Sequence, residues 1–122
     1  MEHISRALVV DDNIDSAMCL RMLLQLKLGC SVRMAHDGPS AVDVAADFQP
    51  ELVLLDLGLP RMNGYEVCQR LRCLPEGHQM VIIAVTGWSR LEDIDRSLES
   101  GFTHHLVKPI DIEALESLLE RV

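Results

Sequence analysis

Short apolar runs alternate with longer amphipathic stretches in this chain of 122 residues, and the alternation repeats five times. The short runs are too brief for helices, whereas the stretches between them carry apolar residues at helical spacing. In the first such stretch, residues 14–28, these include Ala17, Leu20 and Leu24. We therefore predict five strands, each followed by a helix, with the strands at residues 7–10, 31–35, 52–55, 80–85 and 104–107.

The predicted strands are mostly apolar along their whole length, which is typical of parallel strands covered by helices on both faces. Crossovers between parallel strands are right-handed, which favours a doubly wound sheet with helices on both faces. We expect an α/β protein with a flavodoxin-like, doubly wound (βα)5 parallel sheet and the strand order 2-1-3-4-5. The length suits one domain, residues 1–122.

Several residues mark where the helices begin and end. Gly29 is a typical residue just past a helix C-terminus, and Pro39 suits the first position of a helix. Ser89 with Glu92 has the spacing of a capping box for the fourth helix. Asp111 is expected to cap the last helix.

The composition excludes some classes of partner. The net charge is -8 and no basic stripe is present, which argues against direct binding to nucleic acid or to an anionic membrane. No apolar run approaches the roughly 20 residues that span a bilayer, and the N-terminus has no signal-peptide pattern. The four cysteines form no C-x-x-C pair, so we expect buried or half-buried thiols and a cytoplasmic location.

Candidate site residues follow four of the five predicted strands. Asp11 and Asp12 come after the first strand, Asp56 after the third, Thr86 after the fourth and Lys108 after the fifth. The carboxyl ends of parallel strands meet at one edge of the sheet, and in the order 2-1-3-4-5 a crevice opens between strands 1 and 3. We expect these five side chains to converge there.

Charge then indicates the chemistry. Two carboxylates 4 Å apart repel by about 4 kcal/mol at an effective dielectric constant of about 20. Three of them favour a hard divalent cation such as Mg²⁺, which also accepts phosphate oxygens. Each residue alone has an ordinary explanation, such as helix capping by the acid pair or a solvated lysine. The combination at four strand ends favours a phosphoryl-transfer site.

Four segments carry a resemblance to a known family: Val-Val-Asp-Asp-Asn at 9–13, Leu-Leu-Asp-Leu-Gly-Leu-Pro at 54–60 with Met-Asn-Gly at 62–64, Ala-Val-Thr-Gly at 84–87, and Leu-Val-Lys-Pro at 106–109. They resemble the response-regulator receiver domains of two-component signalling. Residues 11–16 and 101–109 are most similar to receivers attached to hybrid sensor histidine kinases. Whether the domain stands alone or was excised from a larger protein stays open.

The resemblance assigns a role to each residue of the site. It implies that Asp56 is the phosphoacceptor, and that Asp12 ligates Mg²⁺ (or Mn²⁺) directly while Asp11 acts mainly through water. The metal ligands would also include Asp56 itself and the backbone carbonyl of Gly58. Thr86 would bind a phosphoryl oxygen through its hydroxyl group.

Lys108 would pair with the phosphoryl group, and its peptide bond to Pro109 would be cis. The donor would be a phosphohistidine on a sensor histidine kinase or a histidine phosphotransfer protein. The domain would catalyse only its own phosphorylation and a slow hydrolysis. Phosphorylation would switch the face made by the fourth helix, the fifth strand and the fifth helix, which could also pair two copies into a homodimer.

Two positions give further predictions. The family usually has Tyr or Phe at the position of His105, which swings inward on activation together with a shift of Thr86. We therefore expect His105 to act as the switch residue, with a bias that depends on pH because histidine titrates near neutrality. In the family that the chain resembles, the positions of Gly58 and Trp88 flank the phosphoryl group. Because Gly58 is small, Trp88 is expected to shield that group from water.

Three alternatives remain at this level. A haloacid-dehalogenase-like phosphatase would need a second aspartate two residues after the nucleophile, where this chain has Gly58. A degenerate binding module would not need the complete polar set. A flavodoxin would need a first loop suited to a phosphate group, whereas here that loop is acidic.

Overall fold

A computed structural model describes residues 4–59, 62–87 and 101–120 of the chain. Five parallel strands form one sheet in the order β2-β1-β3-β4-β5, which confirms the predicted topology. Their bounds are β1 (Arg6–Val10), β2 (Ser31–Ala35), β3 (Leu52–Asp56), β4 (Val81–Thr86) and β5 (His104–Val107).

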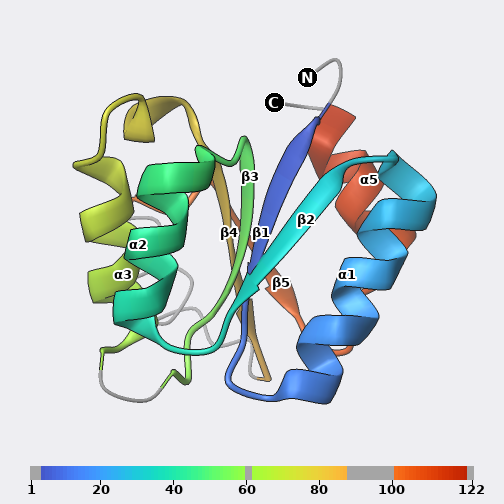
Figure 1. Cartoon of the computed structure of the whole chain (residues 1–122). Helices are drawn as coiled ribbons and strands as arrows, with labels where there is room; N and C mark the ends of the chain where they lie inside the picture. Colours follow the sequence, from blue (N-terminus) through green and yellow to red (C-terminus); the bar gives the residue numbers. More distant parts are fainter. Residues whose placement is uncertain (1–3, 60–61, 88–100, 121–122) are drawn as a thin grey trace.

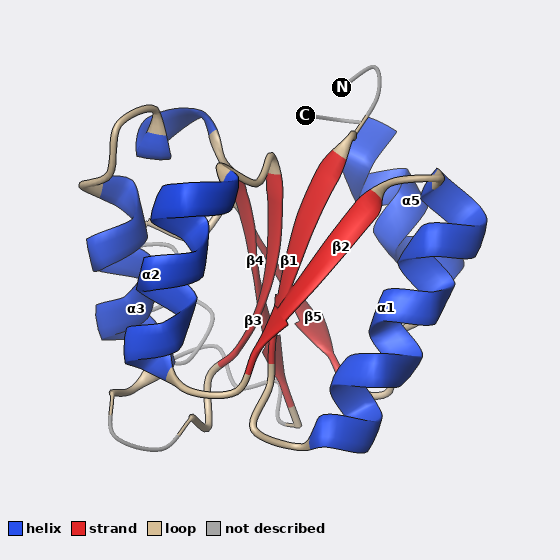
Figure 2. Cartoon of the chain, in the orientation of Figure 1, coloured by secondary structure: helices blue, strands red, loops and turns tan. Residues whose placement is uncertain are grey.

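Helices cover both faces of this sheet (Figure 1). They are α1 (Ile14–Leu28), α2 (Gly38–Phe48), α3 (Gly64–Arg72) and α5 (Ile112–Glu120), with a short 3₁₀ helix η1 at Gly77–Gln79. Figure 2 shows α1 and α5 on one face and α2 and α3 on the other. The predicted capping box of Ser89 and Glu92 lies outside the described residues. Asp111 accepts a hydrogen bond from the Glu113 amide at the start of α5, as predicted.

The helix boundaries follow from local chemistry. The Asn13 side chain caps α1, and the helix ends at Gly29, whose φ of 63° lies in the left-handed region that glycine adopts without strain. Asp37 caps α2. Pro39 is therefore the second helical residue, because α2 begins at Gly38, one position earlier than predicted.

The two faces of the sheet carry separate apolar cores. Because side chains alternate along a strand, Leu8 packs with the cluster under α2 and α3, while its neighbour Val9 packs with the cluster under α1 and α5. Every residue of β3 and β4 is buried, as expected for central parallel strands. The more polar β2 lies at one edge of the sheet, as the predicted strand order required.

Arg72 at the end of α3 holds together one end of the fold. Its guanidinium group donates hydrogen bonds to the carbonyls of Gly101, Gly77 and Met80 and to the Thr103 hydroxyl. These groups belong to the segments that enter β4 and β5. Arg72 thereby fixes the two strands that carry Thr86 and Lys108 at their far ends.

Candidate functional site

The carboxyl ends of the strands lie together at the lower edge of the sheet in Figure 1. Asp11 and Asp12 follow β1 there, and Asp56 ends β3. One carboxylate oxygen from each of these three residues lies within 4.8 Å of the others. We call this group the acidic cluster. Asp11 is only 2% exposed and Asp56 9%, whereas Asp12 is open to solvent.

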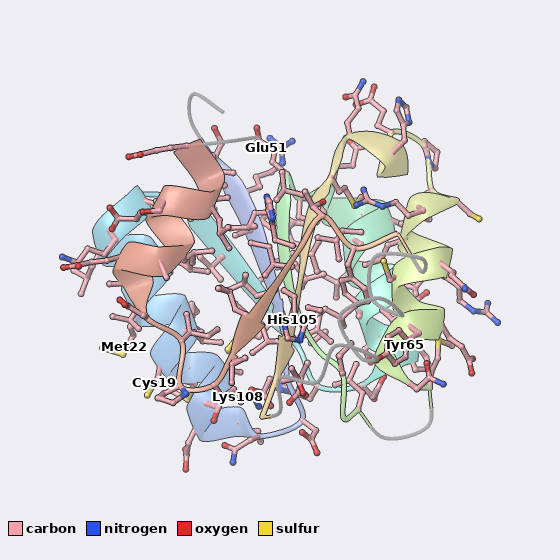
Figure 3. The ribbon with its side chains drawn as sticks, turned by 180° about the vertical axis from the view of Figure 1, so that it is seen from behind. Cys19, Met22, Glu51, Tyr65, His105 and Lys108 are labelled. Atoms are coloured by element: carbon pink, nitrogen blue, oxygen red, sulfur yellow. The ribbon has the colours of Figure 1, made fainter. Side chains whose placement is uncertain are left out.

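Lys108 completes the site from the loop after β5. Its ammonium nitrogen lies 2.8 Å from Asp56 Oδ2 and 3.6 Å from Asp11 Oδ2. Its backbone amide donates to the Thr86 carbonyl, and its peptide bond to Pro109 is cis, as the resemblance implied. Figure 3 shows Lys108 just past the end of β5, close to the first turns of α1. The structure therefore brings these predicted residues to one place.

Backbone amides hold the other oxygens of the two buried acids. The Asn13 amide donates to Asp11 Oδ1, and the Gly58 amide donates to Asp56 Oδ1, each at 2.9 Å. Each carboxylate is thus fixed by an amide on one oxygen while its second oxygen faces Lys108. Such hydrogen bonds pre-orient a reactive carboxylate without using a second side chain.

The pKa values of Asp11 and Lys108 are both raised, for different physical reasons. Burial raises the pKa of Asp11 and the charge of Asp56 adds to this, although the Asn13 amide and Lys108 oppose it. Burial alone would lower the pKa of Lys108, but its hydrogen bond to Asp56 and the charges of Asp56 and Asp11 raise it overall. Three acids against one ammonium group leave excess negative charge that a cation can offset.

The donor set of the acidic cluster fits a hard divalent ion. It consists of carboxylate oxygens that are close enough to share one ion, and oxygen is the donor that Mg²⁺ and Mn²⁺ prefer. Asp11, Asp12 and Asp56 are the residues that would hold it. The role of the Gly58 carbonyl as a further ligand stays a prediction.

Thr86 and His105 lie on neighbouring strands. Thr86 is 6% exposed at the end of β4. His105 pairs in register with Ala84, two residues before Thr86, so the side chains of His105 and Thr86 belong to the same face of the sheet. Figure 3 shows His105 on β5 at mid-sheet. Their roles as switch residues stay predictions, and Trp88 lies outside the described residues.

Sequence reasoning missed two residues of this region. Asn13 caps α1, so the acid pair is not the helix cap. His36, directly after β2, places Nδ1 2.9 Å from the Asp11 carbonyl oxygen. The strand-end argument applied to the second strand would have found His36, because β2 is the neighbour of β1 in the predicted order.

A groove of about 620 Å³ opens between α1 and the loop after β5. Its lining combines Asp11 and Lys108 with the apolar side chains of Leu20 and Ile110. Beside it, α1 exposes an apolar stripe with four-residue spacing, formed by Ile14, Met18, Met22 and Leu26. The site thus adjoins an apolar surface.

The cysteine prediction was wrong in part. Cys30 and Cys68 are buried, but Cys19 and Cys73 are exposed because they lie on the outward sides of α1 and of the end of α3. All four are free thiols. Within the described residues, no helix is both long and apolar enough to span a bilayer.

Comparison with known sequences places the chain among related proteins over nearly its whole length. Residues 7–120 match the response regulator receiver domain family. The chain is 38% identical over 117 residues to the response regulator MprA of Mycobacterium avium, a match that covers 96% of this chain and 49% of MprA. The chain thus spans about half the length of that relative.

Three solved structures have the same fold. The chemotaxis protein CheY4 of Vibrio cholerae has a TM-score of 0.89 at 28% identity, with 98% of each chain covered. The receiver domain of the sensor histidine kinase PA1611 from Pseudomonas aeruginosa, with a magnesium ion in its active site cleft, has a TM-score of 0.85 at 29% identity, covering 96% of this chain and 95% of that one. A chain of the co-crystal structure of the Saccharomyces cerevisiae phosphotransfer protein Ypd1 with the receiver domain of Ssk1 has a TM-score of 0.82 at 26% identity, covering 92% and 83%.

Proposed function

The chain belongs to the response regulator receiver domain family of two-component signalling, and from that premise we propose that Asp56 accepts a phosphoryl group from a phosphohistidine in a Mg²⁺-dependent reaction. One observation carries the proposal. The Asp56 carboxylate lies within 4.8 Å of oxygens from Asp11 and Asp12, and 2.8 Å from the Lys108 ammonium group. The proposed nucleophile therefore lies beside the expected ligands of a divalent ion and beside a positively charged side chain.

The residues divide the work of the transfer. An Asp56 oxygen attacks phosphorus, the new O–P bond forms as the N–P bond breaks, and the donor imidazole leaves with the electron pair. Lys108 is close enough to follow the phosphoryl oxygens, and the Thr86 hydroxyl donates to one of them. Asp11, Asp12 and Asp56 would hold a magnesium ion, whose positive charge would offset the negative charge of the phosphoryl group.

We propose a signalling role rather than turnover of a separate substrate. Gly58 stands where a phosphatase of the haloacid-dehalogenase type would carry a second acid, so no group at that position can protonate a leaving alcohol. The domain then catalyses its own phosphorylation and a slow hydrolysis. Failure to turn over a phosphomonoester such as p-nitrophenyl phosphate is the expected result.

The acceptor assignment is tested by mass spectrometry after incubation with acetyl phosphate and Mg²⁺. The wild type should gain one phosphate, Asp56→Asn should gain none, and Asp43→Asn, which removes an exposed acid on α2, should behave like the wild type. Equal labelling of wild type and Asp56→Asn, or no labelling of the wild type, contradicts the proposal.

The partner would be a sensor histidine kinase or a histidine phosphotransfer protein, as Ypd1 is for Ssk1. The apolar stripe on α1 and the groove beside Lys108 suit a helix that brings its phosphohistidine to Asp56. The predicted homodimer would use β5, α5 and the fourth helix, and that helix lies outside the described residues. It stays a prediction.

Met22→Asp tests the α1 surface, because Met22 is 55% exposed and its loss should not disturb the core. Transfer from a phosphorylated phosphotransfer protein that labels the wild type should slow at least tenfold, while labelling by acetyl phosphate stays unchanged. Ala46→Asp makes the same charge change on the exposed side of α2 and should leave both rates intact. Equal slowing by both variants would rule out a specific role for α1.

A further inference from the structure

The backbone of Asp11 is held by the end of β2. Its amide donates to the Ala35 carbonyl at 3.0 Å, and its own carbonyl lies 2.9 Å from His36 Nδ1. A carbonyl oxygen only accepts hydrogen bonds, so His36 Nδ1 must carry a proton and donate it. His36 is half-buried, which limits competition from water for this contact.

The Asp11 carbonyl belongs to the same rigid peptide unit as the Asp12 amide. A hydrogen bond to that oxygen therefore fixes the plane from which the Asp12 side chain projects. Asp12 is the exposed member of the acidic cluster. The other two acids each have a backbone amide on one carboxylate oxygen and Lys108 near the other.

We propose that His36 is a positioning residue for the divalent ion: its imidazole locks the Asp11–Asp12 peptide so that the Asp12 carboxylate joins the other two. The inference rests on the proposed function, since it concerns the same ion. A side chain that orients a ligand through one intervening group commonly contributes to metal affinity, by about tenfold or more. A hydrogen bond that merely stabilised the loop would instead change the stability without metal and leave the affinity alone.

Three variants of His36 separate these roles. In asparagine the side-chain nitrogen is the same number of bonds from Cα as His Nδ1, so His36→Asn keeps a donor in place. In glutamine the nitrogen is one bond farther. Isothermal titration with Mg²⁺ should show about tenfold weaker binding for His36→Ala and His36→Gln, and near wild-type binding for His36→Asn.

The effect must also depend on Asp12. In an Asp12→Ala background, His36→Ala should leave the remaining Mg²⁺ affinity unchanged, because the side chain that it positions no longer ligates. An equal loss in both backgrounds overturns the inference, as does wild-type affinity in His36→Ala or a failure of His36→Asn to restore binding. Absence of Mg²⁺ binding by the wild type overturns the proposed function itself. Circular dichroism melts in EDTA check that each variant is folded.

Discussion

Replacing Asp11 by asparagine should stabilise the metal-free protein and reduce the stabilisation that Mg²⁺ provides. Asp11 is 2% exposed, and asparagine has nearly the same shape and can still accept the hydrogen bond from the Asn13 amide. The substitution therefore changes the charge of the acidic cluster with little change in packing. Opposite effects with and without metal distinguish this prediction from ordinary damage to the fold.

The magnitude follows from the distances. The carboxylate oxygens of Asp11 and its two acidic neighbours lie within 4.8 Å of one another, so each repulsion is at least about 3.5 kcal/mol for an effective dielectric constant of about 20. The attraction between Asp11 and Lys108 at 3.6 Å offsets about 4.6 kcal/mol of this repulsion for the same dielectric constant. Water around Asp12 and Lys108 screens both effects, and burial of the Asp11 charge adds to the cost. We expect a net gain for Asp11→Asn of about 1 kcal/mol at neutral pH.

The pH dependence has a definite sign. The pKa of Asp11 is raised by burial, so protonated Asp11 favours the folded state. That contribution is complete below the ordinary aspartate pKa of 3.8 and is lost as pH rises through the raised folded value. The advantage of Asp11→Asn over the wild type should therefore appear above the raised pKa and vanish as the solution is acidified toward the ordinary one.

The assay is urea unfolding in EDTA and at a Mg²⁺ concentration 100 times the wild-type dissociation constant. The wild type should gain about 2.7 kcal/mol from that Mg²⁺ concentration, and a variant with tenfold weaker affinity about 1.4 kcal/mol. Asp43→Asn removes one acid elsewhere and should match the wild type in both conditions. The reasoning is refuted if Asp11→Asn is less stable than the wild type in EDTA, or if it gains as much from Mg²⁺.

Two further perturbations test other contacts. Because the pKa of Lys108 is raised in the folded protein, its contribution to stability is complete below the ordinary lysine pKa of about 10.4 and is lost as pH rises through the raised value. In urea titrations without metal, the wild type should therefore lose more stability at alkaline pH than Lys108→Met. Parallel stability curves for the two proteins would contradict this. Arg72→Lys should cost about 2–3 kcal/mol, because an ammonium group cannot replace hydrogen bonds to three carbonyls and a hydroxyl. Arg70→Lys on the exposed side of α3 should change the unfolding free energy by less than about 0.5 kcal/mol, and similar losses for both would remove the special role of Arg72.

The parts of the fold that could be predicted are those set by local pattern. The period of the apolar residues gave the strand and helix types, and a parallel sheet then placed Asp11, Asp56 and Lys108 at one edge without any knowledge of contacts. The N-terminus of α2 was predicted one residue late, because Pro39 suits the first two helical positions almost equally and the Asp37 cap decides between them. The site could be predicted because its residues lie at strand ends, which the strand order alone brings together.

Contacts between side chains and distant backbone could not be predicted. Arg72 donates to carbonyls up to 29 residues away, and nothing in its local sequence distinguishes it from the exposed Arg70 two positions earlier. Unlike Arg72, His36 could be placed next to the end of β1 from the strand order. Its hydrogen bond to the Asp11 carbonyl could not be predicted, because it depends on the conformation of the His36 side chain. Such contacts need the three-dimensional packing.

The proposed function gives a reason for the acidic cluster, which is an unfavourable group of charges in the metal-free protein. An asparagine in place of Asp11 would remove repulsion without loss of packing, so stability alone does not account for a carboxylate there. In the proposed function the cost is recovered when a divalent ion supplies opposite charge, since the ion then binds carboxylate oxygens that are already in place. Lys108 alone cannot neutralise three acids, and its ion pair with Asp56 at 2.8 Å keeps the nucleophile beside the charge that the incoming phosphoryl group will need. The residues that weaken the metal-free protein are therefore the ones that make the site respond to its ligands.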